Sequence, residues 1–389
     1  MKPLFLPSKT SFLSVRRHKL MFADYIRRKE EFFTARHLPF DSVVIYKAGG
    51  SVSFEAVRFL MQHRVPIIHL NWDGNQVAVT LPPGPISGEL RLAQYQAYLD
   101  PKRRNQLAWA VVREKIAKSL DLLRYFQRRY PEVSLPVVES LLSHPTPMGL
   151  EGKVAERYWV EFAKVIHAAQ PRLDYLGRKQ GSNNMGACDP VNALLNYGYG
   201  ILEAKVRVAL HLSGLDIDIG FLHVPQRGAT PLVYDVMELF RWIVDLTIIE
   251  LVEAKKVKPE DFETTTDYKV RVKEEAGHRI VERLTQNFNR TVQVGRQNVQ
   301  YDTVLDRDVR QLARFLLGDI KNVNFSCPFS ADDSKVDADL VQRLLAMNVE
   351  ERKERGISKT TYHYIRKHAL AGEPFRLYGK IRERVLSSS

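Results

Sequence analysis

The chain has 389 residues, and at roughly 150 residues per domain this length suggests two or three domains. Hydrophobic residues make up 44% and charged residues 26%, a balance typical of globular proteins that excludes wholesale disorder. With 58 Lys and Arg against 45 Asp and Glu, the net charge is +13. This excess favours a polyanionic partner, nucleic acid first and an anionic membrane surface second; a charge that only keeps the protein in solution is the alternative.

Cysteine usage and hydropathy indicate the compartment. Cys188 and Cys327 show no metal-ligand spacing and cannot build a disulfide framework, so both are expected as free thiols in a reducing cytoplasm. The N-terminal stretch MKPLFLPSKTSF lacks the apolar core of a secretory signal. The most apolar later stretch, 242–252, contains Asp245 and Glu250 and is far shorter than the ~20 apolar residues of a spanning helix. The sequence therefore predicts a cytoplasmic protein with no membrane partner.

The first eighty-odd residues are expected to form strands with one helix between them. Runs of β-branched and aromatic residues predict strands at 42–47, 67–70 and 77–80. The dipeptide Asp73–Gly74 predicts a tight turn between the last two. Apolar residues at helical spacing predict a helix over 53–64, with Ser53 as its N-cap.

The composition changes after this β-rich region. Residues 82–88 (PPGPISG) carry three prolines and two glycines, which is typical of a linker. Beyond them, apolar residues at spacings of three and four predict helices over 91–100, 105–130, 154–167, 191–213 and 232–255. We therefore expect an α+β protein with a small β-rich domain at 1–85, a linker at 86–100, a larger all-helical domain at 101–330 and a basic C-terminal extension at 331–389.

The common loop motifs of nucleotide and metal binding are missing from the sequence. It contains no GxxxxGK[ST] loop, no GxGxxG after a strand, no HExxH and no CxxC pair. This argues against a P-loop ATPase, a Rossmann oxidoreductase and a zinc-finger module. It leaves open a metal site assembled from distant positions.

The first candidate position is Glu151, which follows Gly149 by two residues and precedes Gly152 (MGLEG) before a predicted helix. A carboxylate at a helix start is favoured by the helix dipole by about 0.3–1 kcal/mol, so capping is the simple interpretation. Glycines on both sides also leave room for a ligand to approach the acid, which capping does not require. The residues alone leave both interpretations open.

Two further positions lie close together in the sequence. His223 follows Gly214 and an apolar run (LDIDIGFL) expected to be extended; in such a place a lone histidine is usually a core residue. Asp235 and Glu238 lie three residues apart in the helix opening PLVYDVME and share one helical face. Two acids on one face repel each other, and a cation beside them removes that cost.

Together, Glu151, His223 and the Asp235/Glu238 pair form a set of nitrogen and oxygen ligands without a thiolate. Such a set suits Mg²⁺ or Mn²⁺, and the imidazole favours Mn²⁺. The ion would present a Lewis acid to a phosphodiester.

Four ordered blocks carry a resemblance to a known family: MGLEGKVAERYW, DPVNALLNYGYGILEA, GLDIDIGFLH and PLVYDVMELFR. They resemble the CRISPR-associated spacer-acquisition integrase, the first of the Cas proteins. The segment SVVIYKAGGSVSFEAVRFLMQHRVPIIHLNWDGN is similar to the β-domain of that family, and DVRQLARFLLGD is a weaker match. The resemblance spans most of residues 40–320.

The resemblance implies a β-domain that forms a homodimer and a helical catalytic domain. Two such dimers would flank a dimer of a small second Cas protein and hold double-stranded DNA, the prespacer, whose 3′-hydroxyl ends attack the CRISPR repeat. The metal ligands would be Glu151, His223 and Glu238, with Mg²⁺ or Mn²⁺ as the ion. Asp235 would support catalysis by orienting a ligand or shaping the charge. Many relatives carry Asp where this chain has Glu238, which leaves the preferred metal open.

The chain extends beyond the clearest match after about residue 330. Residues 351–368 carry six Lys and Arg against two Glu. A solvated charged helix is the simple interpretation. DNA contact is the alternative, with cations on phosphates and Tyr362 or Tyr364 near a strand end.

Three classes of function remain. The first is a metal-dependent DNA integrase that exchanges one phosphodiester for another and therefore needs no ATP. The second is a structure-specific metal-dependent nuclease that acts on branched DNA in repair, with the same ligands but water as the nucleophile. The third is a non-catalytic DNA-binding scaffold, supported by charge alone. The resemblance favours the first.

Overall fold

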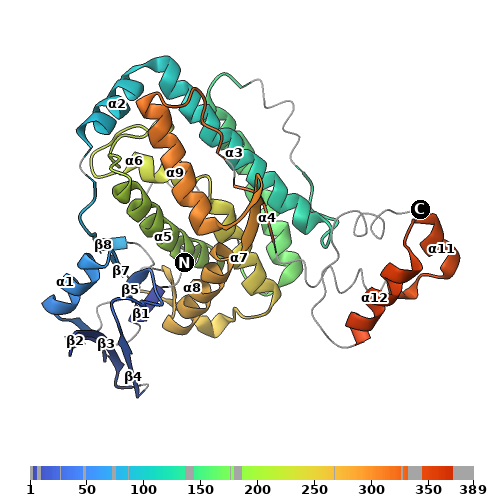
Figure 1. The fold of residues 1–389 in the computed structure, drawn as a ribbon. Helices are drawn as coiled ribbons and strands as arrows, with labels where there is room; N and C mark the ends of the chain where they lie inside the picture. The colour runs from blue at the N-terminus through green and yellow to red at the C-terminus, as the bar shows by residue number, and fades with distance from the viewer. Residues whose placement is uncertain are drawn as a thin grey trace. The chain divides into compact units, whose positions relative to one another are not determined.

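The computed structural model forms two compact units, Met1–Phe329 and Ser330–Ser389 (Figure 1). The structure describes residues 3–6, 10–26, 28–46, 50–71, 76–85, 87–135, 144–175, 177–178, 186–266, 268–325, 327–331 and 344–370. Across these ranges, no helix has both the length and the apolar character needed to cross a membrane.

The N-terminal part of the first unit folds into two four-stranded sheets. The first sheet has the order β1-β5-β7-β8 and consists of β1 (Pro3–Leu6), β5 (Ser42–Tyr46), β7 (Ile67–Leu70) and the antiparallel edge strand β8 (Gln76–Thr80). The second has the order β4-β3-β2-β6 and consists of β4 (Lys29–Phe33), β3 (Lys19–Asp24), β2 (Ser11–Arg16) and β6 (Ser51–Val52). The three strands predicted between residues 42 and 80 are confirmed, whereas the turn at Asp73–Gly74 lies outside the described residues.

Helix α1 (Phe54–Gln62) connects the two sheets and begins as predicted. Ser53 is its N-cap, because the Ser53 hydroxyl accepts the backbone N–H of Ala56 at 3.1 Å. Leu60 of this helix is fully buried in one core with Leu13 of β2 and Val43 of β5. At about 1.5–3 kcal/mol for each buried apolar side chain, this shared core holds the two sheets and α1 together.

The rest of the first unit is mainly helical. Its helices are α2 (Gly88–Leu99), α3 (Pro101–Gln127), α4 (Pro147–Ala169), α5 (Pro190–Leu212), α6 (Pro231–Met237), α7 (Arg241–Glu253), the short 3₁₀ turn η1 (Pro259–Asp261), α8 (Glu274–Phe288) and α9 (Tyr301–Leu317). Helix α5 packs against α6, α7, α8 and α9. The described part of the second unit contains α11 (Val349–Glu354) and α12 (Lys359–Leu370).

Two expectations for this helical part are wrong in detail, although the α+β class is confirmed. Most of 86–100, expected as a linker, is helix α2, because the Ser87 hydroxyl accepts the N–H of Leu90 and starts a helix. The all-helical domain also contains two hairpins, β9 (Phe262–Thr264) with β10 (Val270–Val272) and β11 (Thr291–Val294) with β12 (Gln297–Gln300). Strands of three or four residues are too short for an alternating pattern to stand out.

Three long helices start with the same local signal, a capping side chain followed by proline. The pairs are Asp100–Pro101 for α3, Thr146–Pro147 for α4 and Asp189–Pro190 for α5. In each pair the side-chain oxygen accepts a backbone N–H of the first turn, and proline stands where no N–H is needed. These starts place α4 seven residues earlier than its apolar periodicity suggests.

The predicted helix over 232–255 is two helices. α6 ends at Met237, and the backbone tightens there: the N–H of Leu239 bonds to Val236 and that of Phe240 to Met237, each three residues back. Leu239 and Phe240 are fully buried, which fixes the corner before α7 begins. Glu238 lies at this corner, where a continuous apolar pattern gives no sign of a break.

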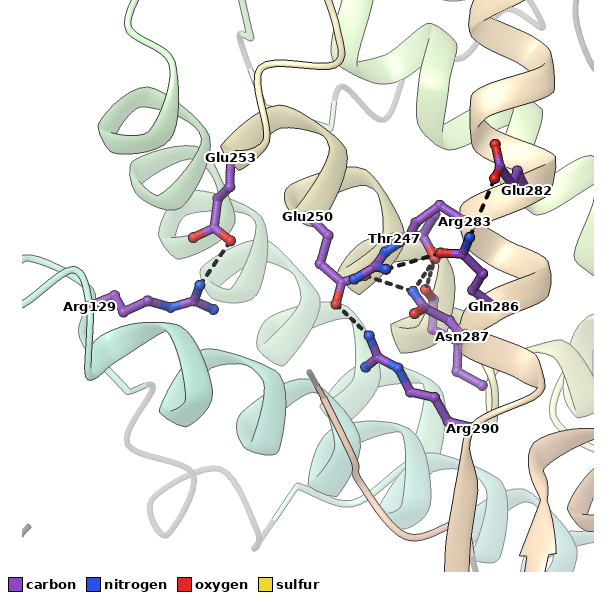
Figure 2. A network of polar contacts seen from close by, with 10 residues as sticks. Arg129, Thr247, Glu250, Glu253, Glu282, Arg283, Gln286, Asn287 and Arg290 are labelled. Carbon is purple, nitrogen blue, oxygen red and sulfur yellow. Dashed lines mark hydrogen bonds and ion pairs between the residues drawn. The ribbon is translucent and has the colours of Figure 1, made fainter. Parts of the chain in front are cut away.

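Helix α7 is apolar and buried, and its acidic residues have specific partners. Figure 2 shows Glu250 between α7 and α8, where its carboxylate pairs with Arg283 and Arg290, both at 2.8 Å. At the next turn, Glu253 accepts from Arg129, just beyond α3, at 2.9 Å. These pairs attach α7 to two neighbouring elements, so the helix that carries Arg241 is held from several sides.

Helix α5 packs closely on α7 at Gly198, which leaves no room for a side chain there. A Cβ at this position would lie 2.6 Å from Cγ1 of Val244, closer than carbon atoms pack. Gly198→Ala should therefore lower the free energy of unfolding by about 1–3 kcal/mol, measured by chemical denaturation. Gly152→Ala is the matched control, since no atom lies within 4 Å of its added Cβ. A Val244→Ala background should reduce the penalty; an equal penalty in both backgrounds would refute this contact as the cause.

Candidate active site

Three of the four predicted site residues, Glu151, His223 and Glu238, line one cavity of about 320 Å³ in the helical part. Its charged and hydrogen-bonding side chains include Lys115 and Lys118 of α3, Glu151 and Tyr158 of α4, Arg178, His223 from the loop after α5, Glu238 at the α6–α7 corner, and Arg241 and Asp245 of α7. The structure thus brings Glu151, His223 and Glu238 to one place. Asp235 lies behind this lining, in contact with His223.

Glu151 lies in the second turn of α4. The expectation that it begins a helix is wrong, because Thr146 starts the helix five residues earlier. The two flanking glycines differ in their surroundings. A Cβ at Gly149 would meet the ring of His144, whereas a Cβ at Gly152 would meet no atom within 4 Å. Only the glycine after the acid therefore leaves open space beside it.

Lys115 joins the two glutamates of the cavity. Its ammonium donates to Oε1 of Glu151 and lies 2.7 Å from Oε2 of Glu238. The lysine side chain is only 17% exposed, so this contact is shielded from water. No sequence pattern points to Lys115, because its partners come from other elements far along the chain.

Glu238 is the most deeply buried of the three candidate ligands, with 5% of its side chain exposed. Arg241 donates to its Oε1 at 3.1 Å. Burial alone would raise the pKa of Glu238, but the positive charges of Arg241 and Lys115 outweigh burial and lower this pKa to about 2. Glu238 is therefore an anion at any physiological pH.

Asp235 fixes the loop that carries His223. Its Oδ2 accepts the backbone N–H groups of Phe221, at 2.5 Å, and Leu222, at 3.0 Å. Its Oδ1 accepts the N–H of His223 at 2.9 Å and lies 2.8 Å from Nδ1 of the same residue. With Nδ1–H donating to Asp235, the lone pair of the neutral ring is on Nε2.

The charge around His223 favours its protonated form. Burial lowers the pKa of His223, but the hydrogen bond to Asp235 and the negative charges of Asp235 and Glu238 outweigh burial and raise it. The imidazole therefore interacts with two carboxylates, Asp235 in α6 and Glu238 at the corner after it.

The loop before His223 contains no strand, contrary to the expected extended run; residues 217–218 form a turn and 221–223 a bend. Gln94 of α2, which is fully buried, holds this loop from the other side. Its amide donates to the carbonyls of Asp216, at 2.8 Å, and Ile219, at 2.9 Å, and accepts the N–H of Asp216 at 2.9 Å. The loop is thus fixed at one end by Gln94 and at the other by Asp235.

Tyr158 and Asp245 line the cavity, and the buried Tyr199 contacts Asp245 from outside the lining. The hydroxyls of Tyr158 and Tyr199 donate to the two oxygens of Asp245 at 2.6 and 2.5 Å. Burial raises the pKa of Asp245, and its hydrogen bonds with the tyrosines oppose that rise. The guanidinium of Arg241 lies 4.3 Å from the centre of the Tyr199 ring. These contacts fix Arg241 beside Glu238.

The donor chemistry of the cavity fits a divalent cation. Two carboxylates and an imidazole supply hard oxygen ligands and one nitrogen, and Glu238 Oε2 is buried without a hydrogen-bond partner among the described residues despite its ion pair with Lys115. Over the same residues, no three His, Cys, Asp or Glu side chains stand close enough to ligate one ion together. Lys115 instead links the two glutamates, so an ion held by both would take over the contacts that Lys115 now makes.

Known proteins with similar sequences cover most of the chain. The family described as CRISPR associated protein Cas1 matches residues 4–286. The chain is 29% identical over 307 residues to CRISPR-associated endonuclease Cas1 1 of Archaeoglobus fulgidus, covering 73% of this chain and 88% of that protein. It is 35% identical over 223 residues to CRISPR-associated endonuclease Cas1 2 of Pyrobaculum aerophilum, covering 55% of this chain and 71% of that protein.

Solved structures share the fold. A casposase bound to an integration product superposes with a TM-score of 0.78 at 30% identity, over 85% of this chain and 95% of that chain. A Cas1 protein from Thermotoga maritima, 19% identical, has the same fold with a TM-score of 0.68, over 84% of this chain and 100% of that chain. The family match includes Glu151, His223 and Glu238. The chain belongs to the CRISPR-associated Cas1 family.

Proposed function

We propose that this Cas1-family chain is a metal-dependent DNA integrase of CRISPR adaptation that joins the 3′-hydroxyl ends of a short duplex to the CRISPR repeat by transesterification. The observation that carries the proposal is the meeting of Glu151, His223 and Glu238 in one cavity that is also lined by lysine and arginine. The casposase relative, solved with an integration product, and the relatives named endonucleases support DNA phosphodiester chemistry.

Glu151, Glu238 and Nε2 of His223 would hold Mg²⁺ or Mn²⁺, which supplies Lewis-acid activation of a phosphodiester. Asp235 keeps the proton on Nδ1 of His223 and so leaves Nε2 as the ligating nitrogen. Gln94 and Asp235 hold the loop of His223 in place from its two ends. A site built on fixed backbone needs little reorganisation when DNA arrives.

Positively charged side chains that line the cavity would bind phosphates of the DNA backbone. Lys115, Lys118, Arg178 and Arg241 all line the cavity, and each can attract a phosphate. Arg178 is positioned by the side chain of Asn192 at 2.9 Å. The net charge of +13 extends this attraction over the whole protein.

The proposed partners are double-stranded DNA, a second copy of the chain and a small second Cas protein. The β-rich domain at 1–85 is proposed as the dimer interface. One structure with the same fold at 18% identity is a Cas6-RT-Cas1–Cas2 complex, and another at 17% identity is a Cas1–DNA complex. Partners of those kinds are therefore compatible with this fold.

The test incubates the protein and the small second Cas protein with an end-labelled duplex and a supercoiled plasmid that contains a CRISPR repeat. We expect labelled plasmid with Mg²⁺ or Mn²⁺ and none with EDTA. A duplex with 3′-deoxy ends is the control, since it lacks the attacking hydroxyl. Nicked plasmid without joined label would instead identify a hydrolytic nuclease. DNA binding without joining or nicking, equal for Glu151→Ala and the unmodified protein, would identify a scaffold.

A further inference from the structure

The described part of the second unit contains α11, α12 and a helical turn at 344–346, and three of its apolar side chains are buried. Leu344, Ile357 and Ile365 are 0%, 5% and 1% exposed. They come from the segment before α11, the turn between α11 and α12, and α12 itself. Each segment therefore buries one apolar side chain, which a separate solvated helix would not do.

The turn between these helices is specified by its own residues. α11 ends in a Schellman motif, in which Gly356 donates to the carbonyl of Lys353 at 2.9 Å and Ile357 donates to that of Arg352 at 2.8 Å. Gly356 has φ +64°, a conformation that glycine adopts without strain. Ser358 then starts α12, because its hydroxyl accepts the N–H of Thr361 at 3.1 Å. A helix, a four-residue turn with glycine and a second helix follow one another as in a helix-turn-helix motif.

One cation of the basic segment is used to hold the motif together. The guanidinium of Arg352 lies 3.7 Å from the centre of the Tyr362 ring, and the Tyr362 hydroxyl reaches the carbonyl of Leu345 at 3.4 Å. Arg352 and Tyr362 therefore stabilise α11 on α12.

The face of α12 opposite Ile365 is exposed and carries groups that can hydrogen-bond in both directions. Lys359, Thr360 and His363 are exposed, and the last two are three residues apart on one face. A hydroxyl and an imidazole can donate and accept, whereas a phosphate contact needs only a donor or a cation. This composition suits the edges of base pairs.

We propose that α11, the turn and α12 form a helix-turn-helix reader that places α12 in the major groove of duplex DNA and recognises a base sequence through Lys359, Thr360 and His363. The six Lys and Arg against two Glu in residues 351–368 match the charge of DNA. Exposed Lys353 of α11 contacts a phosphate, as the first helix of such motifs crosses the backbone. This inference rests on the proposed function for its partner, duplex DNA, but base recognition by α12 needs no catalytic residue.

The test selects binding sites with the full-length protein from duplexes that have a randomised central block, in EDTA, so that the outcome does not depend on the catalytic site. We expect enrichment of a short motif that is bound about tenfold more tightly than a scrambled duplex. The double variant Thr360→Ala/His363→Ala should bind both duplexes with the affinity that the unmodified protein has for the scrambled one. Both replaced side chains are exposed, and unchanged thermal unfolding would verify the fold.

Lys353→Ala is the matched control. It should weaken binding to motif and scrambled duplex by the same factor, keep the motif, and make the slope of log affinity against log salt shallower by about 0.9. The reader is overturned if the unmodified protein enriches no motif, if the double variant enriches the same motif, or if Lys353→Ala abolishes the motif as the double variant does.

Discussion

Glu238→Gln is expected to reduce strand joining by on the order of 10³-fold or more, because Lewis-acid stabilisation worth several kcal/mol depends on this carboxylate in the proposed function. Glu151→Gln and His223→Ala should have effects of the same order. DNA affinity should change little, since it comes mainly from cations on phosphates. The measurements are initial joining rates and DNA binding by titration.

Glu156→Gln is the matched control for these variants, because Glu156 lies on α4 with Glu151 but is exposed. It removes one charge from the same helix and should leave joining unchanged. Glu238 is buried between Lys115 and Arg241, so its variant is also compared with the unmodified protein by chemical denaturation. Normal joining by a folded variant of Glu151, His223 or Glu238 would exclude that residue from the site.

Asp235→Ala is expected to lower the free energy of unfolding by about 3–5 kcal/mol, because it leaves several donors without their acceptor at about 1–3 kcal/mol for each buried group. Three backbone N–H groups and Nδ1 of His223 now meet this carboxylate. Asp235→Asn should lower the free energy of unfolding by less, since one acceptor oxygen remains. Its NH₂ group would nevertheless face N–H donors where the second oxygen of Asp235 now accepts hydrogen bonds. Joining by the Asn variant should fall about 10–100-fold, the range seen when a group that orients a metal ligand is lost.

Two measurements separate this positioning role from direct ligation. Chemical denaturation gives the stability change, and the NMR titration of His223 should show a lower pKa in Asp235→Asn, because the Asp235 charge and hydrogen bond now raise it. An Asn variant with normal stability, an unchanged His223 pKa and no joining would make Asp235 a ligand and contradict the assignment to positioning.

Apolar residues at helical spacing predicted most of the helical part, whereas the starts of α3, α4 and α5 depend on capping and proline, signals that act over a few residues. Asp100–Pro101, Thr146–Pro147 and Asp189–Pro190 each start a helix without help from distant contacts. The corner at Glu238 could not be predicted in this way. Apolar residues continue through Leu239 and Phe240, and only their burial against other helices shows that the chain turns there.

The candidate ligands were recognised from ordered blocks, but the groups that hold them were not. Lys115 and Gln94 lie outside those blocks, in α3 and α2. Lysine and glutamine are common in amphipathic helices, so neither residue stands out in the sequence. The role of the buried Gln94 can be seen only once the fold places the loop that it binds beside it. Contacts between residues distant in the chain depend on the tertiary fold, which a periodicity does not encode.

The Lys115 bridge between the two glutamates bears on how the protein matures in the cell. The ammonium of Lys115 compensates both carboxylates, so we expect the chain to reach its native state without a divalent ion. Zinc fingers behave in the opposite way, since their ligands gather only when metal arrives. In the proposed function, an ion bound by both glutamates would replace the Lys115 ammonium, so its contribution to stability would be the difference between these two attractions. Metal supply would then govern when the protein acts, while the amount of folded protein stays the same.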